Sequence, residues 1–570
     1  MKNRQWPLAL CGLLAVSLVA VGGCGSSPNS GNSSGGSTKA QNGGTIRTSF
    51  TSNIETLDPA QWTDTTSMNP MQEIYDTLVE YNTSNSGLHP ALASRYTVSK
   101  DGLTYTFYLR KGVKFSNGDP LTAADVIYSL NRVTRGDATS SGPAPYGFAY
   151  SDIVGYNQWY NGGKTPPTGM TGLSGLTSPK AGVVQIKLQQ PEAYFLNVLA
   201  LMSADIVDPP VVQKYGQNYE LHAVGTGPME LKSWNQGHQM ILVANPKSWR
   251  PQPHVKQVIF DENVSADLAL LRFQSGEYQL VEGPLPSEVY AKILASASLK
   301  KLYHNVPENG MVWIDFNSTK APFEGTDGTL LRQAVNYALN KSLIIKDITN
   351  GRATELTQPL PPGIPGYNPT IKNPYPYNVA KAKALVKQSG YNGQMLTFIY
   401  PSTTTDRIRT AEIVQEELQA IGLNVKLQGI SQIGNYWPTE DTASGNWNIA
   451  WTDWFQDYPD AQDFLENLLG TQAFGATNVG EWTNPQFQKL IDEADALPAS
   501  QQATRVKDFQ QAETIATNNA CWAFLYNEWN DDLVTSALQP TPGSSQSNLM
   551  LYLHPVLQPQ YSLLWIKGSK

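Results

Sequence analysis

Cysteine is scarce in this chain. Only Cys11, Cys24 and Cys521 occur among the 570 residues, and the first two lie in an N-terminal leader. The rest of the chain has a single cysteine, so it cannot form an intramolecular disulfide. Cys521, between Ala520 and Trp522, is interpreted as a small buried apolar residue. We therefore expect hydrophobic cores alone to stabilise the folded part, even in an oxidising compartment.

Histidine is also sparse, and the usual arrangements of catalytic or metal-binding residues are missing. The six histidines occur singly, and the sequence has neither an HExxH motif nor a pair of cysteines at zinc-site spacing. An enzyme would need a nucleophile, a base or metal ligands that converge. We therefore expect no catalytic site, no metal site and no cofactor.

Charged residues make up only 15% of the chain, and the formal net charge is -8. An acidic balance provides no electrostatic attraction to nucleic acid or to an anionic membrane surface, so we expect no nucleic-acid partner. Hydrophobic residues, at 40%, are sufficient for a folded protein. A chain of 570 residues exceeds the usual size of one core, which indicates two or three lobes.

The only long apolar run is near the N-terminus. Lys2 and Arg4 precede the run 8–21, which is shorter than the ~20 residues that span a bilayer. This pattern predicts a signal peptide over residues 1–23. Val21-Gly22-Gly23-Cys24 resembles the bacterial lipobox, in which the cysteine accepts a lipid and becomes the mature N-terminus. The alternative is an ordinary signal peptide with an incidental cysteine. Residues 24–43 are rich in Gly, Ser and Asn, which predicts a flexible tether.

Strand and helix patterns alternate in the remaining sequence without an internal repeat, which favours a mixed α/β fold. Thr104–Leu109 alternates apolar and polar residues, as a half-buried strand does. Thr122 with Asp125 predicts a capping box that opens a helix ending near Arg132. Further periodic segments predict helices around 331–339 and 413–418 and a strand over 423–427.

Residues 446–458, NWNIAWTDWFQDY, combine a strand with an unusual exit. Trp447 and Ile449 alternate as core residues do. Just beyond the strand, we expect an aromatic and acidic group in a crevice at the strand end, where open α/β sheets hold ligands. This group consists of Trp454, Phe455, Asp457 and Tyr458.

A series of short motifs runs in order from about residue 44 to the C-terminus. It includes Leu57-Asp58-Pro59, DGLTYTFYLR at 101–110, LTAADV at 121–126, Gly225-Thr226-Gly227-Pro228 and Asp457-Tyr458-Pro459-Asp460. Each motif is weak alone, but their order and spacing resemble those of the family 5 extracellular solute-binding proteins. These proteins are the oligopeptide and dipeptide receptors of ABC importers.

The resemblance implies an α/β, bilobed periplasmic-binding-protein-like fold of type II, with an extra third domain and mixed sheets flanked by helices. Mapping the motifs gives lobe I as 44–80, 215–308 and 530–570, the extra domain as 81–214 and lobe II as 309–529. The implied function is the capture of di- to oligopeptides in a cleft between the lobes and their delivery to ABC permease and ATPase subunits. We expect a monomer on the outer face of the cytoplasmic membrane or in the periplasmic space, held by fatty acyl chains such as palmitate on Cys24.

The resemblance also implies roles for individual residues. Asp457 matches the acid that meets the α-ammonium group of a peptide, and Trp454 matches the tryptophan that packs on the peptide backbone. Trp62, Thr63, Asp64 and Thr65 match a segment that lends backbone groups to an extended peptide.

A basic residue found shortly before this tryptophan in some oligopeptide receptors is absent here, where Trp451, Thr452 and Asp453 stand. Arg407 and Arg409 are candidates for binding the carboxylate of a ligand instead. The alternative is that both arginines lie at a solvated helix start.

Other ligands and functions stay open. The abundant Trp and Tyr suit an oligosaccharide, whose rings stack on aromatic faces. The few histidines disfavour nickel or haem. A lipid-anchored enzyme or a chaperone-like adhesin is a further alternative, because a fold does not determine a function.

Overall fold

The computed structural model describes residues 39–82, 87–136, 139–140, 144–160, 168–440, 443–541 and 559–569. The expected signal peptide 1–23, the expected lipid-bearing Cys24 and nearly all of the expected tether 24–43 lie outside the described residues. The description below concerns the compact unit Ala40–Lys570. In its described part, no helix combines the length and the apolar character needed to cross a membrane.

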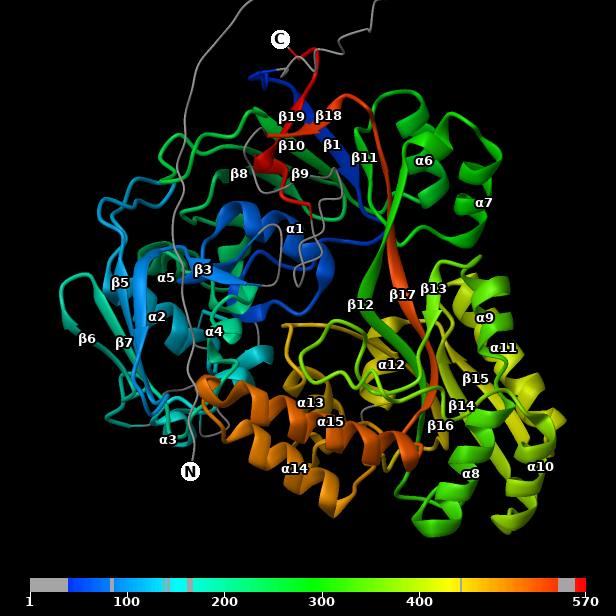
Figure 1. Cartoon of the computed structure of the whole chain (residues 1–570). Coiled ribbons are helices and arrows are strands. Elements are labelled where there is room, and N and C mark those ends of the chain that lie inside the picture. Colours follow the sequence, from blue (N-terminus) through cyan, green and yellow to red (C-terminus); the bar gives the residue numbers. More distant parts are fainter. Residues whose placement is uncertain are drawn as a thin grey trace, which may run out of the picture. The chain divides into compact units, whose positions relative to one another are not determined.

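Two four-stranded sheets are built largely from the first half of the chain (Figure 1). The first has the order β1 (Thr45–Ser49), β10 (Gln257–Asp261), β9 (Gln239–Ala244) and β8 (Met229–Asn235), with β1 parallel to β10 and the other pairs antiparallel. The second is antiparallel, with the order β4 (Ala93–Val98), β5 (Thr104–Leu109), β7 (Val183–Lys187) and β6 (Leu176–Lys180).

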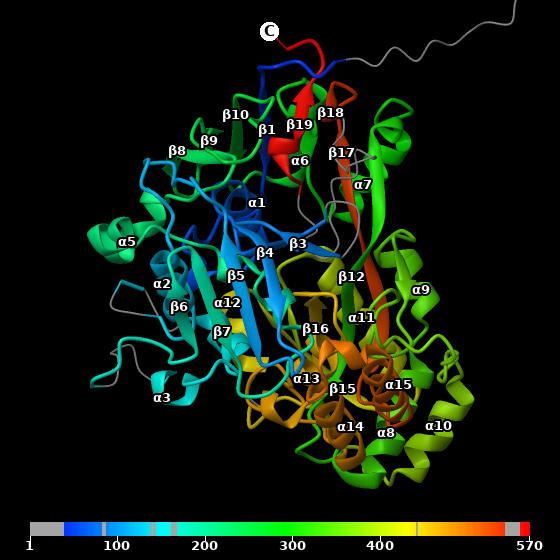
Figure 2. The ribbon, with the colours of Figure 1, turned by 60° about the vertical axis from the view of Figure 1, so that its left-hand side comes forward.

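The largest sheet is mixed and contains two long neighbouring strands. β12 (Tyr303–Phe316) and β17 (Ala523–Val534) are antiparallel and run side by side in both ribbon views (Figures 1 and 2). The sheet has the order β11 (Leu280–Val281), β17, β12, β16 (Ile449–Phe455), β14 (Met395–Pro401) and β15 (Asn424–Ile430), and β13 (Ala353–Glu355) pairs with β17. β14 is parallel to both of its neighbours.

Helices flank the sheets, and two short ribbons complete the described part. The ribbons are β2 (Val79–Tyr81) with β3 (Leu88–Pro90) and β18 (Leu538–Pro540) with β19 (Leu564–Ile566). The helices are α1 (Thr65–Ile74), α2 (Ala123–Val133), α3 (Tyr156–Tyr160), α4 (Phe195–Val198), α5 (Pro209–Tyr215), α6 (Ala266–Gln274), α7 (Ser287–Ala295), α8 (Gly325–Ala338), α9 (Lys341–Ile348), α10 (Val379–Gln388), α11 (Thr405–Ala420), α12 (Ile433–Glu440), α13 (Gln462–Leu469), α14 (Pro485–Asp495) and α15 (Gln502–Asn518).

The local sequence patterns are confirmed where they were strongest. The strand predicted over 104–109 is β5, whose Tyr105, Phe107 and Leu109 are buried. The helix predicted after Thr122 is α2, and its capping box with Asp125 is present. Period-2 burial and a reciprocal cap are determined within a few residues of sequence, so they can be recognised without tertiary information.

Separate hydrophobic clusters underlie the sheets. One joins residues of β1, β5, β7 and β10, and another joins residues of β12, β14, β16 and β17 with α8 and α11. Cys521 is fully buried in the second cluster, in agreement with its interpretation as a small apolar residue. The lobe boundaries stay a prediction, because hydrophobic clusters do not define where one lobe ends and the next begins.

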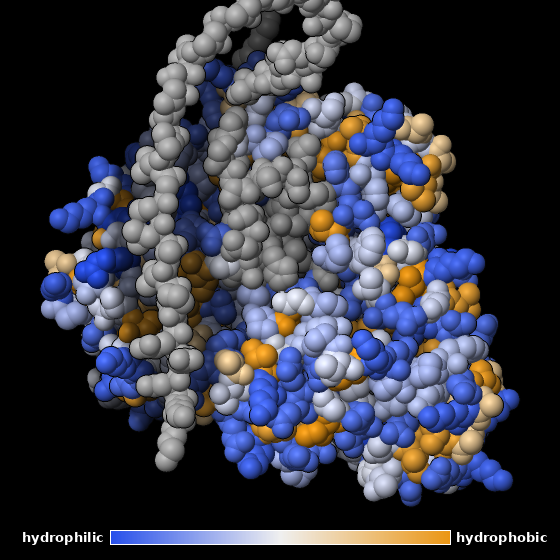
Figure 3. All heavy atoms as spheres, viewed as in Figure 1, coloured by the Kyte–Doolittle hydropathy of each residue, from blue (hydrophilic) through white to orange (hydrophobic). Residues whose placement is uncertain are grey.

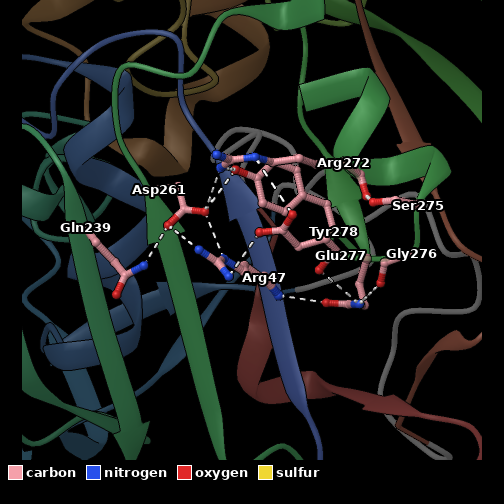
Figure 4. Close-up of polar contacts among 9 residues, drawn as sticks. Arg47, Gln239, Asp261, Arg272, Ser275, Gly276, Glu277 and Tyr278 are labelled. Atoms are coloured by element: carbon pink, nitrogen blue, oxygen red, sulfur yellow. Dashed lines mark hydrogen bonds and ion pairs between the residues drawn. The ribbon is translucent and has the colours of Figure 1, made fainter. Parts of the chain in front are cut away.

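A polar network ties the β1–β10–β9 edge to α6 (Figure 4). Asp261 accepts hydrogen bonds from Arg47 Nε at 2.8 Å, Gln239 Nε2 at 2.8 Å and the Tyr278 hydroxyl at 2.9 Å, and Arg272 Nη1 lies 3.3 Å away. The carboxylate is thus paired on several sides, which compensates for its burial. We interpret this network as structural.

The face drawn in Figure 3 is mostly hydrophilic, with hydrophobic atoms gathered over α6 and α7 at the upper right. The exposed leucines of these helices are Leu268, Leu271 and Leu294. They lie outside the cavities described below.

Candidate ligand-binding site

A cavity of about 580 Å³ is lined by segments that are far apart in the sequence. We call it the aromatic cavity. One set of lining residues is Trp62–Thr65, Met68, Pro145, Tyr146, Phe148, Leu201 and Met202; the other is Trp313, Trp437, Glu440, Thr452–Asp457, Leu468, Thr477 and Val479. Its volume and its largely apolar lining with a few polar groups are typical of sites for small ligands.

Most residues predicted for the site line this cavity. Trp62, Thr63, Asp64, Thr65, Trp454, Phe455 and Asp457 all do so. Arg407 and Tyr458 do not, and their surroundings are described below. The sequence therefore identified residues from two remote segments that the fold brings together.

The strand end that carries the aromatic residues is longer than expected. Trp454 and Phe455 were predicted just beyond the strand, but they belong to β16 and pair with Met311 and Gly310 of β12. The prediction was wrong because β12 continues alongside and offers a pairing edge that no local pattern reveals. Gly310 suits this place, since an added Cβ would lie 2.7 Å from Phe455 Cε1. Trp447 and Ile449 are buried, as predicted.

Asp457 follows this strand, and its carboxyl group meets a residue from another part of the chain. The Tyr146 hydroxyl donates a hydrogen bond of 3.0 Å to Asp457 Oδ1. The backbone N–H of Asp457 donates to Asp463 Oδ2 at 2.9 Å. Burial raises the pKa of Asp457 to about 7, and the hydrogen bond from Tyr146 opposes this shift. Burial and the nearby Asp457 also raise the pKa of Asp463. Asp457 thus places a carboxyl group in the cavity wall, and Asp463 lies behind its backbone N–H.

The loop after Asp457 is fixed by a buried arginine. Arg505 is fully buried and its Nη2 lies 2.6 Å from Asp460 Oδ1. The same oxygen accepts from the backbone N–H of Gln462 at 2.9 Å, at the start of α13. A charge-assisted pair with matched geometry fixes the loop more firmly than a neutral contact would, which holds Asp457 in place.

The opposite wall is formed by the segment before α1. Trp62 is buried, stacks on Tyr146 with ring centres 4.7 Å apart, and donates from Nε1 to the carbonyl oxygen of Asp64 at 2.7 Å. Asp64 caps α1 by accepting from the backbone N–H of Ser67 at 2.8 Å. A cap of this kind fixes where a helix starts.

The backbone of this segment is extended at Trp62 and at Asp64. Thr63, between them, is exposed and takes part in no hydrogen bond with the residues that the structure describes. Its main-chain groups are therefore available to an extended partner.

Tyr458 and Arg407 have other surroundings. Tyr458 is buried, stacks on Tyr194 with ring centres 5.6 Å apart and lines a neighbouring cavity. Arg407 lies in the first turn of α11, with Nη2 3.2 Å from Asp453 Oδ2 and its guanidinium 4.7 Å from the centre of the Trp451 ring. Arg409 is exposed. Arg407 thus reaches the aromatic cavity only through Asp453, which lines it.

Sequence reasoning missed Tyr146, Phe148 and Trp437, which also line the cavity. Tyr146 and Phe148 lie in a short 3-10 helix, Pro145–Tyr150. A pair of aromatic residues in a proline-containing stretch was the only available signal. Tyr146 and Asp457 are 311 positions apart in the sequence, so no local pattern connects them.

The described residues contain no group of three or more His, Cys, Asp and Glu side chains placed to hold a metal ion. The site therefore presents aromatic faces, backbone groups and the carboxyl groups of Asp64, Glu440, Asp453 and Asp457. Such a set can bind an organic solute that carries a cation.

Comparisons with known proteins agree on one family. Residues 87–476 match the model described as "Bacterial extracellular solute-binding proteins, family 5 Middle". The chain is 28% identical over 486 residues to heme-binding protein A of Haemophilus influenzae, with 82% of this chain and 84% of that protein covered. It is 28% identical over 483 residues to the glutathione-binding protein GsiB of Escherichia coli, with 84% and 88% covered.

A solved structure of a periplasmic binding protein is also similar to this chain. The ABC transporter-associated periplasmic binding protein DppA of Helicobacter pylori, in complex with the peptide STSA, superposes with a TM-score of 0.75 at 25% identity, covering 93% of this chain and 99% of that one. The mixed α/β fold with sheets flanked by helices is therefore that of periplasmic binding proteins, as predicted. The chain belongs to family 5 of the bacterial extracellular solute-binding proteins.

Proposed function

We propose that the protein is an extracytoplasmic receptor that captures peptides, from dipeptides to oligopeptides, and delivers them to the permease and ATPase subunits of an ABC importer. The observation that carries this proposal is the carboxyl group of Asp457 in the wall of a cavity lined with aromatic residues. The ABC transporter association named for the similar DppA structure supports the delivery step.

The chemistry of Asp457 suits an α-ammonium group. Asp457 is partly buried, and its carboxyl group accepts a hydrogen bond from the neutral Tyr146 hydroxyl. An ammonium group would supply both a charge and hydrogen bonds, and such charge-assisted bonds are about twice as strong as neutral ones. We propose that Asp457 binds the ligand amine in this way.

The remaining wall suits a peptide backbone. We propose that Trp454 and Phe455 pack on the main chain of the ligand and that Trp62–Thr65 offers backbone groups to it, as the exposed Thr63 supports. Backbone recognition tolerates many side chains, because the main chain is common to all peptides. We propose that the predicted lobes close on this ligand, with β12 and β17 as the long strands between them.

The test is calorimetry with tri-alanine and its N-acetylated form. Tri-alanine is expected to bind, and removal of its charge by acetylation is expected to weaken binding by about tenfold or more. Asp457→Asn should abolish this difference between the two ligands. Absence of binding by any di-, tri- or tetrapeptide mixture would reject the proposal.

Arg407 is proposed as the anchor for a ligand carboxylate, acting beside Asp453. If Arg407 binds the ligand carboxylate, Arg407→Gln should weaken the binding of a free-acid tripeptide by about tenfold. The binding of the corresponding C-terminal amide should be unchanged. Equal losses for both ligands would show that Arg407 only holds Asp453. The exposed Arg409→Gln serves as the matched control.

Membrane attachment is a separate part of the proposal. We propose that Cys24 carries the lipid and that the chain is held at the outer face of the cytoplasmic membrane or in the periplasmic space. Labelling cells with palmitate should mark the wild type, and Cys24→Ala should lose the label. A labelled Cys24→Ala variant would reject lipidation at this residue.

An oligosaccharide receptor is the second candidate. The observation that favours it is the presence of partly exposed tryptophans in the lining, since Trp437 and Trp454 offer faces for the stacking of sugar rings. Native mass spectrometry of protein purified without refolding separates the candidates, because a retained solute reveals its own mass. A hexose series would favour the oligosaccharide, and amino-acid mass differences would favour the peptide.

A further inference from the structure

A second cavity, of about 490 Å³, lies beside Tyr458. We call it the acidic cavity. It shares Phe148 and Thr477 with the aromatic cavity, so the two adjoin. One side comes from the segments around Asp152 and Glu192, and the other from α13, α14 and the chain between them.

The acidic cavity is lined by carboxyl groups and by no described lysine, arginine or histidine. The carboxyl groups belong to Asp152, Glu192, Glu466, Asp492 and Asp495. The guanidinium of Arg505, which is not in the lining, lies 3.2 Å from Asp495 Oδ1 and is also bonded to Asp460. Arg505 pairs with only one of these five carboxyl groups, so the lining offers a cation more hydrogen-bond acceptors than it has cations of its own.

Two carboxyl oxygens in the lining lack partners. Glu192 Oε2 and Glu466 Oε1 accept no hydrogen bond from the residues that the structure describes. Both residues are deeply buried, with 4% and 9% of their surfaces exposed. A buried polar atom without a partner costs free energy. A guest that donates hydrogen bonds would remove this cost.

The lining suits an organic cation better than a metal ion. No three acidic side chains of the described part converge as metal ligands do. The carboxyl groups are spread around a space large enough for an alkyl chain with a charged end. The aromatic rings of Phe148, Tyr194 and Tyr458 offer apolar contact to such a chain and a favourable face to a cation.

We propose that the acidic cavity is a subsite for a cationic side chain of the ligand, an alkylammonium or a guanidinium, and that the protein prefers peptides beginning with lysine or arginine. This inference rests on the proposed function, because an α-ammonium at Asp457 brings the first side chain of the peptide next to Tyr458 and Phe148. Burial raises the pKa of Glu192 and raises the pKa of Glu466 to about 7, and a cation bound beside them would lower both pKa values because it favours the ionised carboxylates.

The test compares Lys-Ala-Ala with norleucine-Ala-Ala, whose side chain has nearly the same shape without the charge. Calorimetry is expected to show at least about tenfold tighter binding of the lysine peptide, the size of a charge-assisted bond. In the double variant Glu192→Gln, Glu466→Gln this ratio should fall to about twofold or less. Because glutamine resembles the protonated glutamate, the variant should fold, and a circular dichroism melt checks this.

The matched control is Glu493→Gln, which removes a charge from exposed Glu493 on the same helix as Asp492 and Asp495. Glu493 does not line the acidic cavity, so this variant should keep the wild-type ratio of the affinities for the two peptides. Equal binding of the two peptides by the wild type, or a ratio unchanged in the double variant, would overturn the subsite. Tri-alanine binding that depends on Asp457 would then still support the proposed function.

Failure of the proposed function is recognised separately. If no peptide binds, the melting temperature of the protein is measured with 1,5-diaminopentane as the probe. A rise in the wild type that the double variant lacks would support the cation site alone. Equal shifts in both proteins, or no shift, would overturn it.

Discussion

Peptide binding is expected to depend on pH through one carboxyl group. Burial raises the pKa of Asp457 to about 7, so the proton is bound over much of the acidic range when the cavity is empty. An ammonium group pairs with the ionised carboxylate only, so the proton must leave before the ligand binds. Affinity should therefore rise as the pH rises towards 7 and fall as the pH falls below it.

The magnitude follows from the ionised fraction. Two pH units below the pKa, about 1% of the carboxyl groups are ionised, and the apparent affinity scales with the competent fraction. Binding of tri-alanine at pH 5 should thus be on the order of 100-fold weaker than at pH 7.5. The α-ammonium of the peptide, with a pKa of ~7.7–8, stays mostly charged over this range.

The assay is calorimetry of tri-alanine at half-unit steps from pH 5 to pH 7.5, with the N-acetylated peptide as the control. Asp457→Asn cannot ionise, so it should give a flat profile that lies below the wild type at pH 7.5. A flat profile for the wild type would refute the role assigned to Asp457. The same slope in Asp457→Asn would assign the titration to another group.

Two further changes test the site, and one tests the stability of the fold. Tyr146→Phe removes a hydrogen bond that lowers the pKa of Asp457, so the midpoint of the pH profile of tri-alanine binding should move to higher pH. An unchanged midpoint would contradict this. Arg132→Gln leaves Asp58 buried without its partner, which lies 2.6 Å from Arg132 Nη2, and urea denaturation should show a loss of about 3–5 kcal/mol. A loss of unfolding free energy below about 1 kcal/mol, which is typical of an exposed ion pair, would contradict this expectation. Gly310→Ala places a Cβ 2.7 Å from Phe455, so the melting temperature and the affinity for tri-alanine should both fall. If neither falls, the Phe455 ring can shift without cost and the close packing does not matter.

The elements that the sequence predicted well are those whose cause is local. The alternation in 104–109 and the capping box of Thr122 with Asp125 depend on neighbours within a few residues, and both are present. The end of β16 was misjudged, since its last residues pair with β12, more than 100 residues away in the chain.

The candidate site divides in the same way. Residues 62–65 and 454–457 carry motifs of the family, so they could be named in advance, and they line one cavity. The hydrogen bond from Tyr146 to Asp457 and the placement of Arg407 beside Asp453 depend on how remote segments pack. Such contacts leave no periodic trace in the sequence.

The most direct test of the central claim is a crystal structure of the protein with tri-alanine. The account predicts the peptide in the aromatic cavity, with its ammonium within hydrogen-bond distance of the Asp457 carboxylate and its backbone beside Trp454. A peptide bound elsewhere, or one whose ammonium points to solvent away from Asp457, would contradict the account.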